Sequence, residues 1–122
     1  MIAAILKENT KGETRVAATP KTVKELIDNG LQLRVQSGSG DSSFHSDQEY
    51  QDIGAEITPD TSSTLKDADI VLKVSPLTID EVDLLNEGCI YISLLQTTKE
   101  IDLIKKLSEK KVTGFSMDLI PR

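Results

Sequence analysis

The stretch that decides the fold is residues 67–95, DADIVLKVSPLTIDEVDLLNEGCIYISLL. The β-branched run Ile70–Val74 near its start predicts a buried strand. Thr78 is a good N-cap for a short helix, and Gly88 is placed to end that helix. The apolar run Cys89–Leu95 then predicts a second strand. A strand–helix–strand unit of this kind is typical of a parallel sheet.

The same alternation continues towards both ends of the chain. Further strands are predicted at Ile2–Leu6, Leu31–Val35, Ala55–Ile57 and Val112–Met117. Helices are predicted after the caps Thr19 and Thr98, at Asp47–Ile53, and, as one or two turns, at Ser62–Lys66. We therefore expect a single α/β domain, a three-layer sandwich around a mostly parallel sheet, flavodoxin-like or Rossmann-like.

Composition excludes several functional classes. The chain has 122 residues, with 14 Lys and Arg against 20 Asp and Glu, which gives a net charge of −6. This acidic balance argues against a nucleic-acid-binding surface. One Cys and one His exclude an intrachain disulfide and argue against a zinc site. The longest uncharged apolar run, Cys89–Leu95, is far shorter than the roughly 20 residues of a membrane helix. Met1 leads directly into a strand, so we expect no signal peptide and a soluble domain in a reducing compartment.

A glycine-containing loop follows the second predicted strand. Gly38-Ser39-Gly40 supplies the first two glycines of a dinucleotide-binding fingerprint but lacks the third. It also follows the second strand, whereas the fingerprint follows the first. The pattern favours a plain turn over a phosphate cradle.

Two cationic residues are better candidates for a site. Arg15 follows the carboxyl end of the first strand, and Lys73 lies at the same end of a later strand, where ligands gather in open α/β sheets. A guanidinium there is suited to a carboxylate or phosphate. The alternative for Arg15 is a surface residue that is solvated or paired with Glu13. The alternative for Lys73 is an outward position on an edge strand.

The remaining titratable residues have simpler interpretations. His45 lies in a polar loop with no obvious partner, so we expect it to be solvated. Cys89 begins an apolar strand and is interpreted as a buried, unreactive thiol. Asp80, Glu81 and Asp83 are interpreted as a solvated first helical turn. Residue patterns alone thus predict an α/β domain with a cationic crevice and no self-contained active site.

Several segments resemble a known family in order along the chain. They are Lys7-Glu8, GETRVAATP at 12–20, VQSGSG at 35–40, DADIVLKV at 67–74 and MDLIPR at 117–122. Together they are similar to the N-terminal region of the alanine dehydrogenase and pyridine-nucleotide transhydrogenase family, over essentially the whole chain.

Within the family, the closer resemblance is to the NAD(H)-binding α-subunit of proton-translocating NAD(P) transhydrogenases. Alanine dehydrogenases carry a catalytic His after the fifth strand, and the matching position here is Gln96. Without that His, the general acid/base step of oxidative deamination has no evident agent. The ending Ser116–Arg122 also looks like the transhydrogenase version of the sixth strand.

The resemblance implies a site and its partners. Arg122 matches an Arg that contacts the nicotinamide end of NAD(H), and Arg15 and Lys73 match residues that hold the carboxylate substrate of alanine dehydrogenases. Family members continue into a Rossmann domain that residues 1–122 do not contain, so we expect weak or absent NAD binding by this chain alone and no hydride transfer.

The implied partners are the rest of the α subunit, the membrane and NADP(H)-binding components, and a second copy in a homodimer. The implied place is the cytoplasm, or the cytoplasmic or matrix face of an inner membrane, without insertion of this chain. The alternatives are the substrate-binding domain of an alanine dehydrogenase-like enzyme and a stand-alone binding module.

Overall fold

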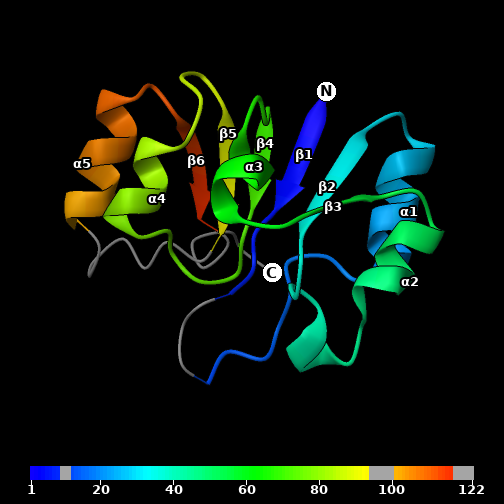
Figure 1. The fold of residues 1–122 in the computed structure, drawn as a ribbon. Helices are drawn as coiled ribbons and strands as arrows, with labels where there is room; N and C mark the ends of the chain where they lie inside the picture. The colour runs from blue at the N-terminus through cyan, green and yellow to red at the C-terminus, as the bar shows by residue number, and fades with distance from the viewer. Residues whose placement is uncertain (9–11, 94–100, 117–122) are drawn as a thin grey trace.

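Six short strands form one parallel sheet at the centre of the protein (Figure 1). The computed structural model describes residues 1–8, 12–93 and 101–116. The strand order is β3-β2-β1-β4-β5-β6, and every neighbouring pair is parallel. The strands are β1 (Ile2–Ile5), β2 (Gln32–Gln36), β3 (Glu56–Thr58), β4 (Ile70–Leu72), β5 (Ile90–Ser93) and β6 (Thr113–Ser116). The predicted single α/β domain with a parallel sheet is therefore confirmed.

Short helices connect the strands. They are α1 (Pro20–Asp28), the 3-10 turn η1 (Asp41–Ser43), α2 (Asp47–Asp52), α3 (Thr61–Leu65), α4 (Ile79–Asp83) and α5 (Ile101–Glu109). A side chain caps the start of each of the first four α-helices: Thr19, Ser46, Asp60 and Thr78 accept a hydrogen bond from a backbone N–H of the first turn. Within the described residues, none of these helices has the length and apolar character needed to cross a bilayer.

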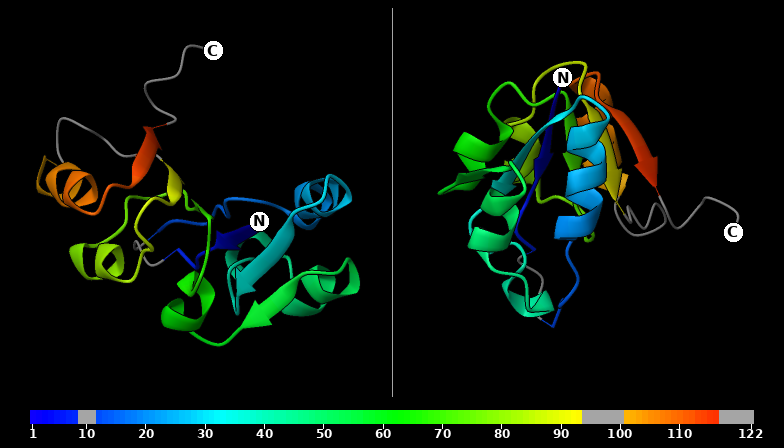
Figure 2. Two further views of the ribbon diagram at one scale, coloured as in Figure 1. Left: turned by 90° about the horizontal axis from the view of Figure 1, so that it is seen from above. Right: turned by 90° about the vertical axis from the view of Figure 1, so that its right-hand side faces the viewer.

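The sheet separates two apolar cores. Along β1 the side chains alternate, so that Ala3 and Ile5 enter one core and Ala4 enters the other. The first core packs under α1 and α2 through Val23 and Tyr50. The second core packs against the helices on the opposite face, with members such as Leu65, Val82 and Leu107. Each fully buried Val or Leu side chain contributes about 1.5–3 kcal/mol to stability. Figure 2 shows the helices on both sides of the sheet.

The order of the strands reverses between β1 and β4. The chain leaves β1 towards β2 and β3 on one side, and it leaves β4 towards β5 and β6 on the other. The connections after β1 and β4 therefore diverge and leave room at their carboxyl ends, which is where ligands bind in open α/β sheets. Arg15 lies in the connection that leaves the carboxyl end of β1, and Lys73 comes directly after the carboxyl end of β4.

The observed strand ends differ from the predicted ones by a few residues. The run Ile70–Val74 pairs as a strand only through Leu72. The amide of Lys73 still donates to the carbonyl of Ile92 at 3.2 Å, and the next amides turn to a side chain. The loop predicted at 37–43 contains the 3-10 turn η1.

Candidate functional site

A cavity of about 360 Å³ lies at the carboxyl ends of β4 and β5. Its wall combines the residues that lead into α1 with the ends of these two strands. The lining residues are Arg15, Val16, Ala17, Leu72, Lys73, Val74, Ile92 and Ser93. The sequence prediction that Arg15 and Lys73 share one crevice therefore agrees with the geometry. Most of the lining is apolar, and its polar residues are Arg15, Lys73 and Ser93.

Lys73 is buried, with only 2% of its surface exposed. Its strand β4 lies between β1 and β5, so the alternative of an outward lysine on an edge strand is wrong. The ammonium Nζ lies 3.1 Å from Oε1 of Glu81 in α4. An opposite charge at this distance compensates for the cost of burying an ammonium.

Arg15 lies at the outer margin of the cavity, and its side chain is 62% exposed. Its Nε donates to Oε1 of Glu13 at 2.8 Å, and Nη2 donates to Oε2 at 2.9 Å. Arg15 therefore pairs with Glu13, as one of the two interpretations of the sequence expected, and it also lines the cavity. These hydrogen bonds from the guanidinium lower the pKa of Glu13 from 4.5 to about 2. Glu13 holds the guanidinium in one orientation at the cavity.

Two carboxylates that the sequence patterns did not assign to the site hold the segment after β4. Glu8 accepts the amides of Val74 and Ser75, both at 2.9 Å. Glu81 accepts the amide of Thr78 at 2.8 Å, while Thr78 accepts the amide of Glu81. The interpretation of Glu81 as a solvated residue is wrong, because it is 9% exposed and paired with Lys73. The spacing Thr78-x-x-Glu81 is a capping-box pattern and was a recognisable signal for part of this role.

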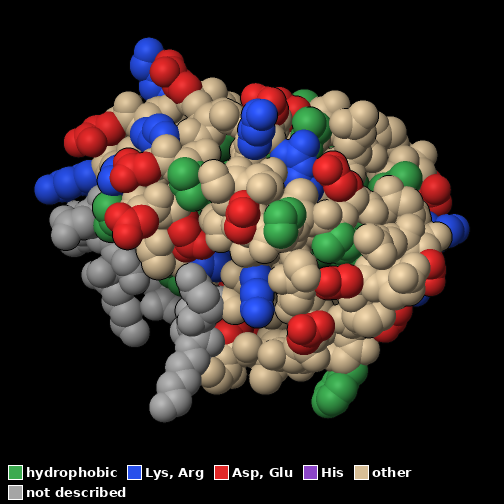
Figure 3. Space-filling model, viewed as in Figure 1, with side chains coloured by type: hydrophobic (Ala, Val, Ile, Leu, Met, Phe, Trp, Pro, Cys, Tyr) green, Lys and Arg blue, Asp and Glu red, His purple; other side chains and the backbone are tan. Residues whose placement is uncertain are grey.

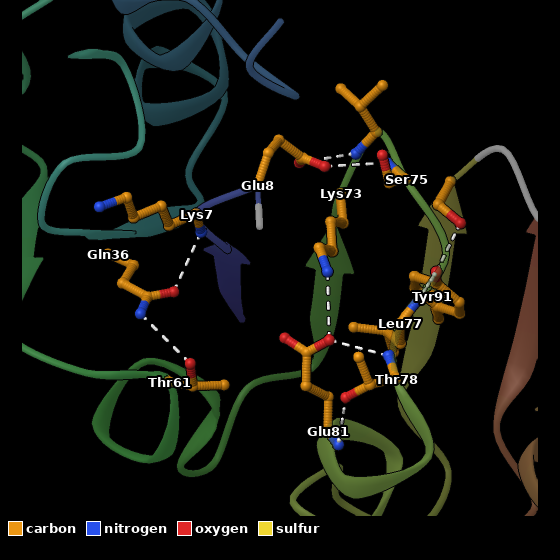
Figure 4. A network of polar contacts seen from close by, with 12 residues as sticks. Lys7, Glu8, Gln36, Thr61, Lys73, Ser75, Leu77, Thr78, Glu81 and Tyr91 are labelled. Carbon is orange, nitrogen blue, oxygen red and sulfur yellow. Dashed lines mark hydrogen bonds and ion pairs between the residues drawn. The ribbon is translucent and has the colours of Figure 1, made fainter. Parts of the chain in front are cut away.

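A hydroxyl pair lies beside the cavity on β5. Ser93 donates to the phenol oxygen of Tyr91 at 2.5 Å, and that oxygen also accepts the amide of Leu77 at 2.9 Å. Burial raises the pKa of Tyr91 to about 12, so the phenol stays protonated at neutral pH. Figure 4 shows these contacts together with those of Lys73, Glu8 and Glu81. The arrangement fixes Ser93 at the cavity wall.

The other sequence candidates lie outside this cavity. The amide of Gly38 donates to the carboxylate of Asp47 at 2.9 Å, so the loop at 37–43 binds a side chain of the protein, as expected of a turn. His45 has a partner that the sequence did not reveal, since its Nδ1 lies 3.2 Å from Oε2 of Glu49. Cys89 is buried, as predicted, and burial raises the pKa of its thiol.

Gln96 and Arg122 lie outside the described residues, so their roles stay predictions. In the ranges 1–8, 12–93 and 101–116 no group of His, Cys, Asp and Glu side chains is arranged to hold a metal ion. Figure 3 shows acidic and basic side chains interspersed over the face it displays. An apolar lining with a few polar residues is typical of a ligand-binding cavity.

The chain is similar to proteins of one known family. A family model described as "Alanine dehydrogenase/PNT, N-terminal domain" matches residues 4–122. The chain is 34% identical over 122 residues to the NAD(P) transhydrogenase subunit alpha of Haemophilus influenzae, covering all of this chain and 23% of that protein. It is 32% identical over 116 residues to the NAD(P) transhydrogenase subunit alpha of Cereibacter sphaeroides, covering 95% of this chain and 22% of that protein. An alanine dehydrogenase of Bacillus subtilis is 32% identical over 120 residues, covering 98% of this chain and 32% of that protein.

Solved structures have the same fold. A transhydrogenase from Sinorhizobium meliloti superposes on the whole chain with a TM-score of 0.94 and 31% identity, and the match covers 36% of that chain. An L-alanine dehydrogenase superposes on 95% of this chain and 32% of its own with a TM-score of 0.89; at 23% identity this likeness shows the fold alone. The chain thus spans between 22% and 32% of the length of these curated relatives.

Proposed function

The chain belongs to the family of alanine dehydrogenase/PNT N-terminal domains, and we propose that it forms one wall of the NAD(H) cleft in an NAD(P) transhydrogenase α subunit. The observation that carries the proposal is the cavity at the carboxyl ends of β4 and β5, with Arg15 and Lys73 in its lining. Its place beside the reversal in strand order is where this class of sheet binds ligands. The reaction that the whole protein would catalyse is hydride transfer between NADH and NADP⁺.

The chemistry of the cavity suits the nicotinamide end of the cofactor. Apolar side chains such as Val16, Leu72 and Ile92 can pack against the uncharged dihydronicotinamide ring of NADH. The exposed guanidinium of Arg15 is a donor that suits the oxygen of a carboxamide. The carboxylate of Glu13, bound to that guanidinium, offsets its charge and so weakens its attraction for a pyrophosphate.

The proposed role of the chain is to bind, orient and exclude water. NAD(H), when bound, supplies the hydride chemistry, so the protein needs no acid or base for that transfer. In this proposal Arg122 contacts the nicotinamide end, and a Rossmann domain provides the opposite wall. The membrane and NADP(H)-binding components, and a second copy of the α subunit, are the partners. The assembly lies on the cytoplasmic or matrix face of an inner membrane, where it couples hydride transfer to proton translocation, and residues 1–122 alone bind NADH weakly and are inactive.

A second candidate is the substrate-binding domain of an alanine dehydrogenase-like enzyme. The observation in its favour is that Arg15 and Lys73, which match carboxylate-binding residues of those enzymes, line one cavity. Gln96 at the position of the catalytic His argues against it, since an amide does not transfer a proton near neutral pH. Oxidation of L-alanine by the complete protein would favour this second function, and hydride transfer from NADH to an NADP⁺ analogue would favour the first.

Substitutions in the cavity test the proposal. Arg15→Ala and Lys73→Ala are made in the complete protein to which residues 1–122 belong, and NADH affinity and hydride transfer are measured. We expect each variant to bind NADH about tenfold more weakly, because Arg15→Ala removes a charged donor and Lys73→Ala removes the ion pair that holds the cavity wall. Lys24→Ala is the control, since Lys24 is an exposed residue of α1 that pairs with Asp28. NADH binding and hydride transfer at wild-type level in both cavity variants would contradict the proposal.

A further inference from the structure

The backbone leaves the sheet directly after Lys73 and must find new hydrogen-bond acceptors. The amide of Lys73 is the last to donate to the neighbouring strand, at the carbonyl of Ile92. Val74 is half-buried and Ser75 is buried, and Pro76 has no N–H. Two successive amides in this position need acceptors, since an unpaired buried amide is costly.

Glu8 supplies both acceptors with one carboxylate. Its Oε2 accepts the amide of Val74 and its Oε1 accepts the amide of Ser75, each at 2.9 Å. Glu8 follows the end of β1, where the amide of Leu6 donates to the carbonyl of Leu72 at 3.3 Å. In Figure 4 its side chain reaches from the end of β1 to the segment after β4. The carboxylate thus joins the two strands between which the strand order reverses.

The same segment is fixed at its other end by Glu81. One oxygen of that carboxylate, Oε1, accepts both the ammonium of Lys73 at 3.1 Å and the amide of Thr78 at 2.8 Å. Residues 73–78 are therefore held between two carboxylates, one from the end of β1 and one from α4. Lys73 and Val74, which lie in this segment, line the cavity.

We propose that Glu8 is a positioning residue of the ligand cavity: by accepting the amides of Val74 and Ser75 it sets the place of Lys73 and Val74 in the cavity wall. The inference rests on the proposed function, because the ligand whose binding depends on this wall is NADH. Glu8 itself need not touch the ligand.

The geometry makes two conservative substitutions informative. In Glu8→Gln one oxygen becomes an NH₂ group, which would face a backbone donor. In Glu8→Asp the charge remains, but the side chain is one methylene shorter and cannot reach both amides. A role of Glu8 through charge alone, for example on the nearby guanidinium of Arg15, would survive in Glu8→Asp, whereas a positioning role would not.

The experiment measures amide hydrogen exchange in the 122-residue chain and NADH affinity in the complete protein at 25 °C. Glu25→Gln, on the exposed side of α1, is the matched control. We expect exchange at Val74 and Ser75 to be at least about tenfold faster in Glu8→Gln and Glu8→Asp, with Ala4 and Val35 unchanged. We expect NADH affinity to fall about tenfold in both variants while the proteins stay folded.

Two failures are distinguishable. If the complete wild-type protein binds NADH and both variants bind it with wild-type affinity, the positioning role is wrong. It is also wrong if Glu8→Asp binds NADH with wild-type affinity and only Glu8→Gln binds it more weakly. Unchanged exchange at Val74 and Ser75 would also overturn it. If the wild-type complete protein does not bind NADH, the proposed function fails, and the inference that rests on it fails as well.

Discussion

Lys73 shows how a single residue connects the fold to the site. Its backbone continues the β4–β5 pairing, its fully buried ammonium pairs with Glu81, and the residue forms part of the cavity lining. A lysine at this position is tolerated because the neighbouring helix supplies a carboxylate at 3.1 Å. The buried ion pair therefore belongs to the architecture of the cavity wall.

Removing the ammonium should destabilise the protein. In Lys73→Met the carboxylate of Glu81 stays nearly buried, at 12% side-chain exposure, without its charge partner. We expect the free energy of unfolding in urea to fall by about 3 kcal/mol. The double variant Lys73→Met/Glu81→Gln removes both charges and should recover part of the loss. A single variant as stable as the wild type would show that the pair is not needed.

The lowered pKa of Glu13 makes the stability of the protein depend on pH. Hydrogen bonds from Arg15 lower the pKa of Glu13 from 4.5 to about 2. A carboxyl whose pKa is lowered on folding contributes stability above its unfolded pKa, and this contribution is lost as the pH falls from about 4.5 towards 2. Carbon-13 NMR of the Glu13 carboxyl should give a midpoint of about 2 in the wild type and a higher midpoint in Arg15→Gln, in which the backbone hydrogen bonds to this carboxylate remain. Equal midpoints in the two proteins would refute the pairing.

Among single residues, the sequence identified the cationic residues of the site better than the groups that form hydrogen bonds there. Arg15 and Lys73 could be selected because they follow strand ends on the ligand-binding edge. Glu8 could not, because its role depends on two amides 66 and 67 residues away. The partner of His45 was missed although it is four residues away, because the helix that brings Glu49 close begins only at Asp47.

The helices are short, so their ends determine their stability. Helix α4 has 5 residues and a complete capping box between Thr78 and Glu81. A helix of this length does not persist on its own, and its first turn depends on the cap and on packing. The same cap places Glu81 against Lys73, so the end of one short element shapes the cavity.

Loss of the cap should change both the free energy of unfolding and the rate of amide exchange in α4. We expect Thr78→Ala to lower the free energy of unfolding by about 1 kcal/mol, because the amide of Glu81 loses its acceptor. Thr78→Ser keeps the hydroxyl and should stay close to the wild type. In Thr78→Ala, amide exchange in α4 should also accelerate relative to exchange in α1. Equal stability of the Ala and Ser variants would show that the hydroxyl does not cap α4.

The type and order of the elements followed from the sequence, whereas their ends did not. Apolar periodicity and caps located each described strand and α-helix, because both depend on local residues. The end of β4 at Leu72 depends on which neighbour accepts the next amide, and for Val74 that neighbour is Glu8. Such long-range choices leave no local pattern in the chain.

For the whole molecule, the alternation of strands and helices predicted a parallel sheet covered on both faces. The strand order β3-β2-β1-β4-β5-β6 places β1 beside β4, although paired residues such as Ile5 and Leu72 lie far apart in the sequence. This adjacency brings Glu8 to the segment after β4 and forms the edge at which the cavity lies. The candidate site is thus a consequence of topology more than of any single motif.

An NMR titration of the isotopically labelled complete protein with NADH tests directly whether the cavity at the ends of β4 and β5 binds this cofactor. We expect chemical shifts to change at the cavity wall, at Arg15–Ala17, Lys73, Val74 and Ser93. Amides around the hollow at the opposite edge of the sheet, such as Asp69 and Gly88, should stay unchanged. Saturable binding of NADH with shifts confined to that opposite edge, or with none at the cavity wall, would contradict the claim.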